Sequence, residues 1–222
     1  MKSPAGTSQD AAALAVTLAR GLEQMALPMS AVVQEKLLAY MGLLVKWNRV
    51  YNLTAVRDPA EMVTRHLLDS LSVVPHIRGP RVLDVGSGAG LPGIPLALAK
   101  PEWQFVLLDS NRKKTRFITQ SCIELGLANV SVETSRIEDY CPQVLFNTVI
   151  SRAFSELSTM LVATGRLCCP EGIMLAMKGE YPAAELATLT ESAPGFVVRG
   201  VDALQVPGLD AQRHVVRVEL QA

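Results

Sequence analysis

The chain has 222 residues, of which 49% are hydrophobic, and its 21 basic and 21 acidic side chains leave no formal net charge. This length predicts one main domain with room for a small extension. The balanced charge excludes a protein drawn to nucleic acid or membrane by its overall field, so an anionic partner must meet a local basic patch. No uncharged apolar run approaches about 20 residues, which excludes a membrane-spanning helix.

Four cysteines accompany three histidines, and they lack the C-x-x-C spacing of zinc sites. They are Cys122, Cys141, Cys168 and Cys169. We therefore expect no bound metal, and we interpret the cysteines as reduced, mostly packed thiols of a cytoplasmic protein.

The N-terminal part of the chain predicts helices. Residues 10–25 are rich in Ala and Leu. Ser30 suits the N-cap of a second helix, in which apolar residues recur at steps of four and three from Val33 to Trp47. Residues 47–54 are too polar and aromatic for a buried strand and too irregular for a helix.

Another helix is predicted by its capping residues. Asp58 suits the N-cap, Pro59 the first turn, and Glu61 the reciprocal acid of a capping box. Helical spacing predicts polar surface pairs along this helix: Arg65 with Asp69, and His66 with Asp69 and Ser70. We expect residues 1–79 to form a helical cap.

Beyond residue 80, short apolar runs alternate with helical stretches, which is typical of a parallel sheet with crossover helices. The predicted strands span residues 82–85, 105–108, 130–133, 148–150 and 173–177. Two more strands, 196–206 and 214–220, are joined by a short connection that requires an antiparallel pair. We therefore expect an α/β, Rossmann-like fold in which residues 80–222 form one compact unit with a C-terminal antiparallel hairpin.

A glycine-rich stretch follows the first predicted strand. Gly86, Gly88 and Gly90 alternate there, and Pro92 lies where a helix begins. Glycines turn the backbone tightly and let it approach a ligand closely. A dinucleotide fingerprint, G-x-G-x-x-G, would need its third glycine at Leu91, so a nicotinamide-dependent oxidoreductase is the weaker alternative.

An acidic residue, Asp109, ends the second strand. It follows the glycines by about 20 residues, a position that suits hydrogen bonds to ribose hydroxyls. Together with the stretch from Asp84 to Gly90, this pattern resembles S-adenosylmethionine-dependent methyltransferases of the Rossmann-like class.

Longer motifs narrow the resemblance. They are residues 46–54 (KWNRVYNLT), 65–70 (RHLLDS), 84–95 (DVGSGAGLPGIP), 108–110 (LDS), 151–154 (SRAF) and 177–179 (MKG). From about Lys36 to its C-terminus, the chain resembles the bacterial 16S ribosomal RNA guanine-N7 methyltransferases, the glucose-inhibited division protein B family. Asn147 departs from the family's usual Asp and puts one local hydrogen bond in doubt.

The resemblance implies S-adenosylmethionine as cofactor, and 16S ribosomal RNA or the small ribosomal subunit as partner. The cofactor contacts that it implies are Gly86, Leu91, Ile137, Glu138 and Arg152. Ligands of open parallel sheets bind outside the carboxyl ends of the strands, which adds Ser87, Gly88, Gly90 and Asp109 as candidates.

Methylation at guanine N7 needs no general base, because this nitrogen has a lone pair and no proton. No catalytic residue is therefore assigned, although Arg152 and Lys178 follow neighbouring strands and are candidates to orient the base or its phosphate. Each also suits a structural ion pair. The candidate RNA contacts are Arg112, Lys113, Lys114, Arg116, Arg65, His66 and Lys178.

The glycine motif predicts the cofactor but does not specify the acceptor. A methyltransferase on another acceptor and a non-catalytic RNA- or ribosome-binding protein with this fold both remain alternatives. The sequence carries no signal for an oligomer, and a monomer is the default expectation.

Overall fold

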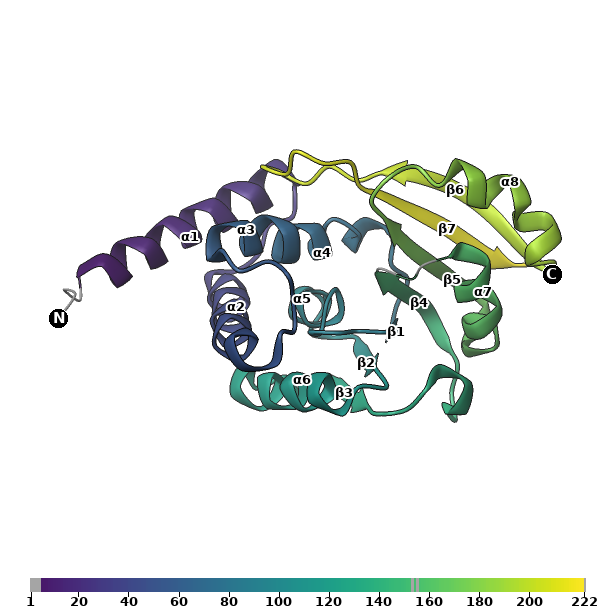
Figure 1. Cartoon of the computed structure of the whole chain (residues 1–222), viewed down its shortest axis with the longest axis horizontal. Helices are drawn as coiled ribbons and strands as arrows, with labels where there is room; N and C mark the ends of the chain where they lie inside the picture. The colour runs from purple at the N-terminus through teal and green to yellow at the C-terminus, as the bar shows by residue number, and fades with distance from the viewer. Residues whose placement is uncertain (1–4, 153, 155, 222) are drawn as a thin grey trace.

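The computed structural model describes residues 5–152, 154 and 156–221, and these form a seven-stranded sheet flanked by helices (Figure 1). The strands lie in the order β3-β2-β1-β4-β5-β7-β6. Their bounds are β1 Arg81–Val85, β2 Gln104–Leu108, β3 Val130–Glu133, β4 Phe146–Arg152, β5 Cys168–Lys178, β6 Phe196–Ala203 and β7 His214–Leu220. Strands β1 to β5 pair in parallel, whereas β7 is antiparallel to both β5 and β6. The predicted α/β fold with an antiparallel end is confirmed.

Strand β1 is the topological switch point of the sheet. It pairs with β2 on one side, where Val85 lies opposite Leu108, and with β4 on the other, where Asp84 lies opposite Ile150. The chain therefore leaves β1 in one direction and returns on its other side, which opens a crevice at the carboxyl ends of these strands.

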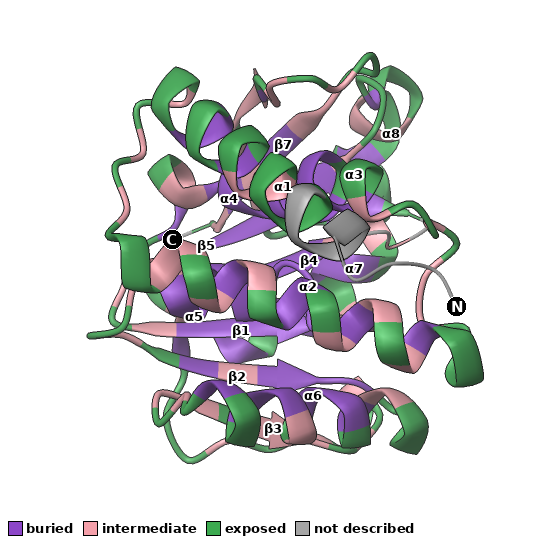
Figure 2. Cartoon of the chain, turned by 90° about the vertical axis from the view of Figure 1, so that its left-hand side faces the viewer, coloured by how far each residue is buried: buried purple, intermediate pink, exposed green. Residues whose placement is uncertain are grey.

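Helices cover both faces of the sheet. On one side of the sheet, α5 Gly93–Ala99 contacts β2 and α6 Arg112–Leu125 contacts β3. Helix α2 Ala31–Tyr51 packs on α5 and α6, and α1 Ala5–Gln24 packs on α2. The other side packs against α7 Leu157–Thr164 and α8 Ala183–Ser192. Adjacent residues of a strand point to opposite faces, so Val82 belongs to the first core and Leu83 to the second. Figure 2 shows the buried residues of α2 facing the sheet and its exposed residues facing outward.

The second N-terminal helix is longer than the sequence pattern predicted. Ser30 caps α2 as expected, since its hydroxyl accepts a hydrogen bond from the Val33 N–H. However, α2 continues through Tyr51, so the prediction of irregular structure from residue 47 is wrong for its first five residues. The ring of Trp47 lies 5.2 Å from that of Tyr51 and 5.5 Å from that of Phe117 on α6, and this packing favours the last turn.

Residues 59–71 form a helix with a wide central turn. It comprises α3 Pro59–Met62, the π-helical η1 Val63–Leu68 and α4 Asp69–Leu71. The predicted N-cap is confirmed, because an Asp58 carboxylate oxygen accepts a hydrogen bond from the Ala60 N–H at 2.9 Å. π-Helical turns occur often at functional sites, and this one lies between the first helices and the sheet.

Short 3₁₀ turns complete the chain: η2 Val74–His76, η3 Ile137–Asp139 and η4 Gly165–Leu167. In the described part of the chain, no helix is both long and apolar enough to cross a membrane. Its four cysteines are free.

Candidate functional site

The loop after β1 has the backbone conformation that its glycines predict. Gly86, Gly88 and Gly90 have φ angles of +69°, +60° and +85°, a region that side chains with a Cβ rarely adopt. The loop is fixed to the next strand, because the N–H groups of Gly86 and Ser87 both donate to the Leu108 carbonyl, at 2.8 and 3.1 Å. The loop is thus held in one conformation at the switch point.

Asp84 connects this loop to α5. It is fully buried on β1, and one of its carboxylate oxygens accepts a hydrogen bond from the Gly93 N–H at 2.9 Å. The other oxygen is buried and has no hydrogen-bond partner among the described residues. Burial raises the pKa of Asp84 from 3.8 to about 7, while the Gly93 N–H and the charge of Arg152 oppose the rise.

Helix α2 supports the same loop. The Tyr40 hydroxyl, on α2, donates to the Ala89 carbonyl at 2.6 Å. Tyr40 is fully buried, and burial raises its pKa well above the ordinary value, so the hydroxyl remains a donor. The N-terminal helices therefore contribute directly to the shape of the site.

Asp109 follows β2 and faces the glycine loop. One of its carboxylate oxygens accepts from the Gly88 N–H at 2.9 Å, and the other accepts from the Asn111 N–H at 2.8 Å. The Lys114 ammonium nitrogen lies 3.9 Å from Oδ2 of Asp109. A carboxylate has about four acceptor positions, so two remain for ligand hydroxyl groups.

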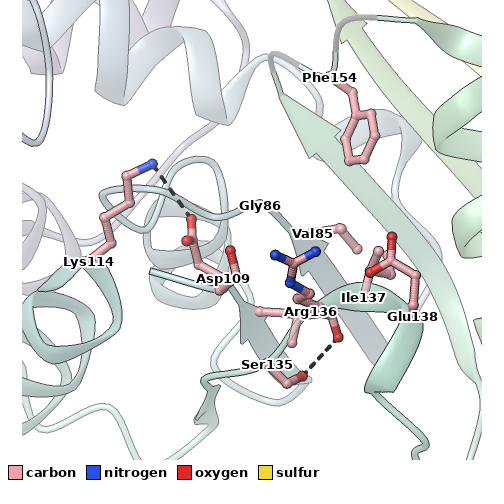
Figure 3. A pocket seen from close by; sticks show the side chains of 11 residues that line it. Val85, Gly86, Asp109, Lys114, Ser135, Arg136, Ile137, Glu138 and Phe154 are labelled. Atoms are coloured by element: carbon pink, nitrogen blue, oxygen red, sulfur yellow. Dashed lines mark hydrogen bonds and ion pairs between the residues drawn. The ribbon is translucent and has the colours of Figure 1, made fainter. Parts of the chain in front are cut away.

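A cavity of about 360 Å³ lies at the carboxyl ends of these strands (Figure 3). Its lining residues are Val85, Gly86, Leu108, Asp109, Ser110, Lys114, Ser135, Arg136, Ile137, Glu138 and Phe154. A Cβ built on Gly86 would meet no atom within 4 Å, so this glycine leaves open space. The side chains of Arg136 and Glu138 both lie at the cavity in Figure 3.

Only some of the predicted cofactor contacts line this cavity. Gly86, Asp109, Ile137 and Glu138 do so. Five others, Ser87, Gly88, Gly90, Leu91 and Arg152, are not among its lining residues. Ser87 and Leu91 are only 1% and 4% exposed, so their side chains serve the packing of the loop.

Arg152 belongs to an ion-pair cluster, the alternative role that its position suited, but its partner Asp69 was not predicted. One Asp69 carboxylate oxygen lies 3.0 Å from Arg152 Nη1, and the other lies 2.7 Å from Arg213 Nε. Asp69 is 2% exposed. The predicted pairing of Asp69 with Arg65 or His66 on the helix surface is therefore wrong: Asp69 points inward, and Arg65 instead lies 3.7 Å from Glu61.

His66 is also buried. Its Nε2 lies 2.9 Å from the Thr54 hydroxyl, and its Nδ1 lies 3.0 Å from the Arg65 carbonyl. Burial lowers the pKa of His66 to about 4, and the charge of Arg152 contributes to this shift. At neutral pH the imidazole is uncharged, which disfavours the predicted role of His66 as a cationic RNA contact.

The basic residues after Asp109 separate into two environments. Arg112, Lys113 and Arg116 are exposed on α6, whereas Lys114 is half-buried and lines the cavity. Lys178 has a side chain that is only 11% exposed and pairs with Glu185 at 2.8 Å. Three of the cations predicted to contact RNA are thus exposed on the surface of α6. Lys178 is not exposed in this way, because its side chain is mostly buried and paired with Glu185.

Other residues of the site had weaker signals in the sequence. Phe154 lines the cavity and belongs to the SRAF motif, but its side chain was given no role. Arg213 had no signal, because nothing near it in the sequence indicates its partner. Asn147, where the family usually has an Asp, still accepts a hydrogen bond: its amide oxygen accepts from the Arg81 N–H at 3.0 Å.

Within residues 5–152, 154 and 156–221, no group of three or more His, Cys, Asp or Glu side chains is arranged to hold a metal ion. The polar side chains that line the cavity are the carboxylates of Asp109 and Glu138, the cations of Lys114 and Arg136, and the hydroxyls of Ser110 and Ser135.

Solved structures with a similar fold include methyltransferases. A SAM dependent methyltransferase from Aquifex aeolicus superposes with a TM-score of 0.56 and 22% identity, covering 73% of this chain and 94% of that one. The glycopeptide N-methyltransferase MtfA gives a TM-score of 0.59 at 11% identity, covering 71% of this chain and 88% of that one. At these identities the likeness establishes the fold alone.

Sequence relatives are much closer. The Ribosomal RNA small subunit methyltransferase G of Chromobacterium violaceum is 53% identical over 205 residues, covering 92% of this chain and 97% of that protein. The protein of the same name from Nitrosospira multiformis is 51% identical over 209 residues, covering 91% and 95%. A family model, GidB, described as rRNA small subunit methyltransferase G, matches residues 33–216. The agreement of the family model with these relatives, over nearly the whole chain, shows that the chain belongs to the GidB family.

Proposed function

We propose that this protein transfers a methyl group from S-adenosylmethionine to N7 of a guanine in the 16S ribosomal RNA of the small subunit. The observation that carries the proposal is the cavity at the carboxyl ends of β1 and β2, which combines the glycine loop, Asp109 and η3 in a member of the GidB family. Such an enzyme would act in the cytoplasm, where ribosomes are assembled.

The residues at the cavity fit the donor. Asp109 keeps two acceptor positions for ribose hydroxyls, and Glu138 offers a carboxylate at the opposite wall for an exocyclic amino group. Gly86 leaves space where any other residue would place a Cβ. When bound, S-adenosylmethionine supplies an electrophilic methyl group on a positively charged sulfur.

Catalysis requires the protein to position the acceptor rather than to move a proton. Guanine N7 attacks with its own lone pair, and a reactive geometry needs it about 3 to 3.5 Å from the methyl carbon, in line with the bond that breaks. Neutral His66 and the paired Lys178 are therefore compatible with the reaction, since neither must act as a base. In duplex RNA this edge of guanine lies in a groove that side chains cannot enter, so the target must be unpaired or splayed out.

The exposed cations of α6 supply a surface for the RNA backbone. Arg112, Lys113 and Arg116 are exposed on the helix that follows the ribose acid Asp109, so bound RNA would pass the mouth of the cavity. Contacts of this kind carry little sequence preference and weaken as salt rises.

The decisive experiment incubates the protein with radiolabelled S-adenosylmethionine and either free 16S ribosomal RNA or assembled small subunits, and maps the labelled base. We expect the label on a guanine, and we expect the labelled RNA chain to be cleavable at that nucleotide, as is typical of N7-methylguanine. Absence of label from both substrates, despite donor binding measured by calorimetry, would refute the RNA methyltransferase and favour another acceptor. A Lys113→Ala, Arg116→Ala double variant should bind RNA with a smaller salt dependence, and the Glu23→Ala variant on α1 serves as a surface control.

A further inference from the structure

Arg166 lies outside the cavity but contacts the main chain of the loop that forms one of its walls. It belongs to η4, between α7 and β5, and it is not among the described residues that line the cavity. Its Nη1 donates to the Tyr140 carbonyl at 2.8 Å, and its Nη2 donates to the carbonyls of Ile137 and Glu138 at 2.5 and 3.2 Å. One guanidinium thus binds three carbonyls: two of η3 and one of Tyr140, the residue that follows it.

These contacts determine the direction of the peptide groups in η3. In a trans peptide the carbonyl and the following N–H point in opposite directions. Because Arg166 binds the Ile137 carbonyl, the N–H of the same peptide group, that of Glu138, points away from Arg166. Glu138 lines the cavity and Arg166 does not. The positive charge also polarises these peptides and strengthens their N–H groups as donors.

We infer that Arg166 is a positioning residue for the adenine ring of the donor: it orients the η3 backbone so that an N–H group meets a ring nitrogen. This inference rests on the proposed function, because it assumes that η3 receives the adenine. Arg166 itself contacts neither donor nor acceptor. Its planar fork suits the task, since a lysine cannot bind three carbonyls with one fixed geometry.

The test compares Arg166→Ala and Arg166→Lys with the wild-type protein. Calorimetry measures the Kd of S-adenosylmethionine and of 5′-methylthioadenosine, which keeps the adenosine but lacks the amino acid part. We expect Arg166→Ala to raise both Kd values by about tenfold, the effect of losing roughly one well-aligned hydrogen bond to the ring. The Kd values of Arg166→Lys should fall between those of the wild-type protein and of Arg166→Ala. In both variants kcat at saturating donor should change less than about twofold, and the KM for RNA should not change.

Arg78→Ala is the control for loss of a guanidinium that binds main-chain carbonyls, although Arg78 also pairs with Glu219 at 2.7 Å. Arg78 also donates to main-chain carbonyls, those of Glu171 and Gly172 at 3.1 and 3.5 Å, near the start of β5 rather than at its carboxyl end. Hydrogen exchange should show faster exchange of the amides of residues 137–140 in Arg166→Ala and not in Arg78→Ala. If the alanine variant does not fold, the same comparisons are made with Arg166→Lys.

Wild-type affinity for both ligands in the Arg166 variants would overturn the inference. So would equal losses of affinity in the Arg166 and Arg78 variants, because these would indicate a general effect on folding. If the wild-type protein bound neither ligand, the proposed function itself would fail, and this outcome is distinct from the other two.

Discussion

Replacing Asp84 by asparagine should remove a large pH dependence of stability. Asp84 is fully buried, one of its oxygens lacks a partner in the described structure, and burial raises its pKa from 3.8 to about 7. The folded state therefore keeps a proton that the unfolded state releases near pH 4. Between these two pH values stability falls as pH rises, and a shift of about three pKa units corresponds to about 4 kcal/mol in total.

The asparagine side chain of the Asp84→Asn variant cannot ionise, yet its amide oxygen can still accept from the Gly93 N–H. Urea denaturation at several pH values gives the free energy of unfolding of both proteins. We expect the variant to gain about 3 kcal/mol on the wild type between pH 5 and pH 8, since the effects of all other groups cancel in the difference. Asp58→Asn, at an exposed N-cap, controls for the loss of one negative charge. A difference between Asp84→Asn and wild type that stays constant across this range would refute the raised pKa.

Three further predictions test other parts of the protein. His66 has a pKa lowered to about 4, so the contribution of its neutral ring to stability is fully present above pH 6.5 and is lost as pH falls toward 4. His66→Gln should remove this loss of about 3 kcal/mol in urea titrations, and a difference between variant and wild type that does not change with pH would contradict this. Gly126→Ala should cost about 1 to 2 kcal/mol in thermal unfolding because Gly126 has a positive φ angle and a Cβ there meets open space. Gly90→Ala should cost more, because Gly90 also has a positive φ angle and its Cβ would lie 2.6 Å from Cδ1 of the buried Ile94. Only Gly90→Ala should raise the Kd of S-adenosylmethionine in calorimetry. Equal Kd values for the Gly90→Ala and Gly126→Ala variants would show that the glycine loop does not bind the donor. Asp69→Asn should destabilise the protein by about 3 kcal/mol, because it leaves two half-buried guanidinium groups without their carboxylate. Glu61→Gln, at an exposed ion pair, should change stability by less than about 1 kcal/mol, and similar losses in the two variants would show that burial of Asp69 is unimportant.

Local patterns predicted the parts of the site that depend on local physics. The glycines after β1 need positive φ angles wherever the chain turns so tightly, and Asp109 follows a short run of buried apolar residues. Both signals are contained within a few residues, so the strand, the loop and the acid were placed correctly.

Contacts between distant segments were not predictable in this way. Asp69 looked like a surface residue because helical spacing brought Arg65 near it, but its partners are 83 and 144 residues further along the chain. Likewise, residues 47–51 have little helical pattern of their own, and Phe117 on α6 provides the packing that extends α2. Lys178 has a partner, Glu185, which lies on α8 after an intervening turn. In each case tertiary packing decided the environment of the residue.

The order of the strands has a consequence for synthesis of the chain. Strand β7 is made after β6 but lies between β5 and β6, pairing with both. A nascent chain that has emerged only as far as β6 therefore holds a strand with no neighbour, and the edge of β5 is left open. Unpaired strand edges attract other chains, so this interval is when the growing polypeptide most needs protection from aggregation.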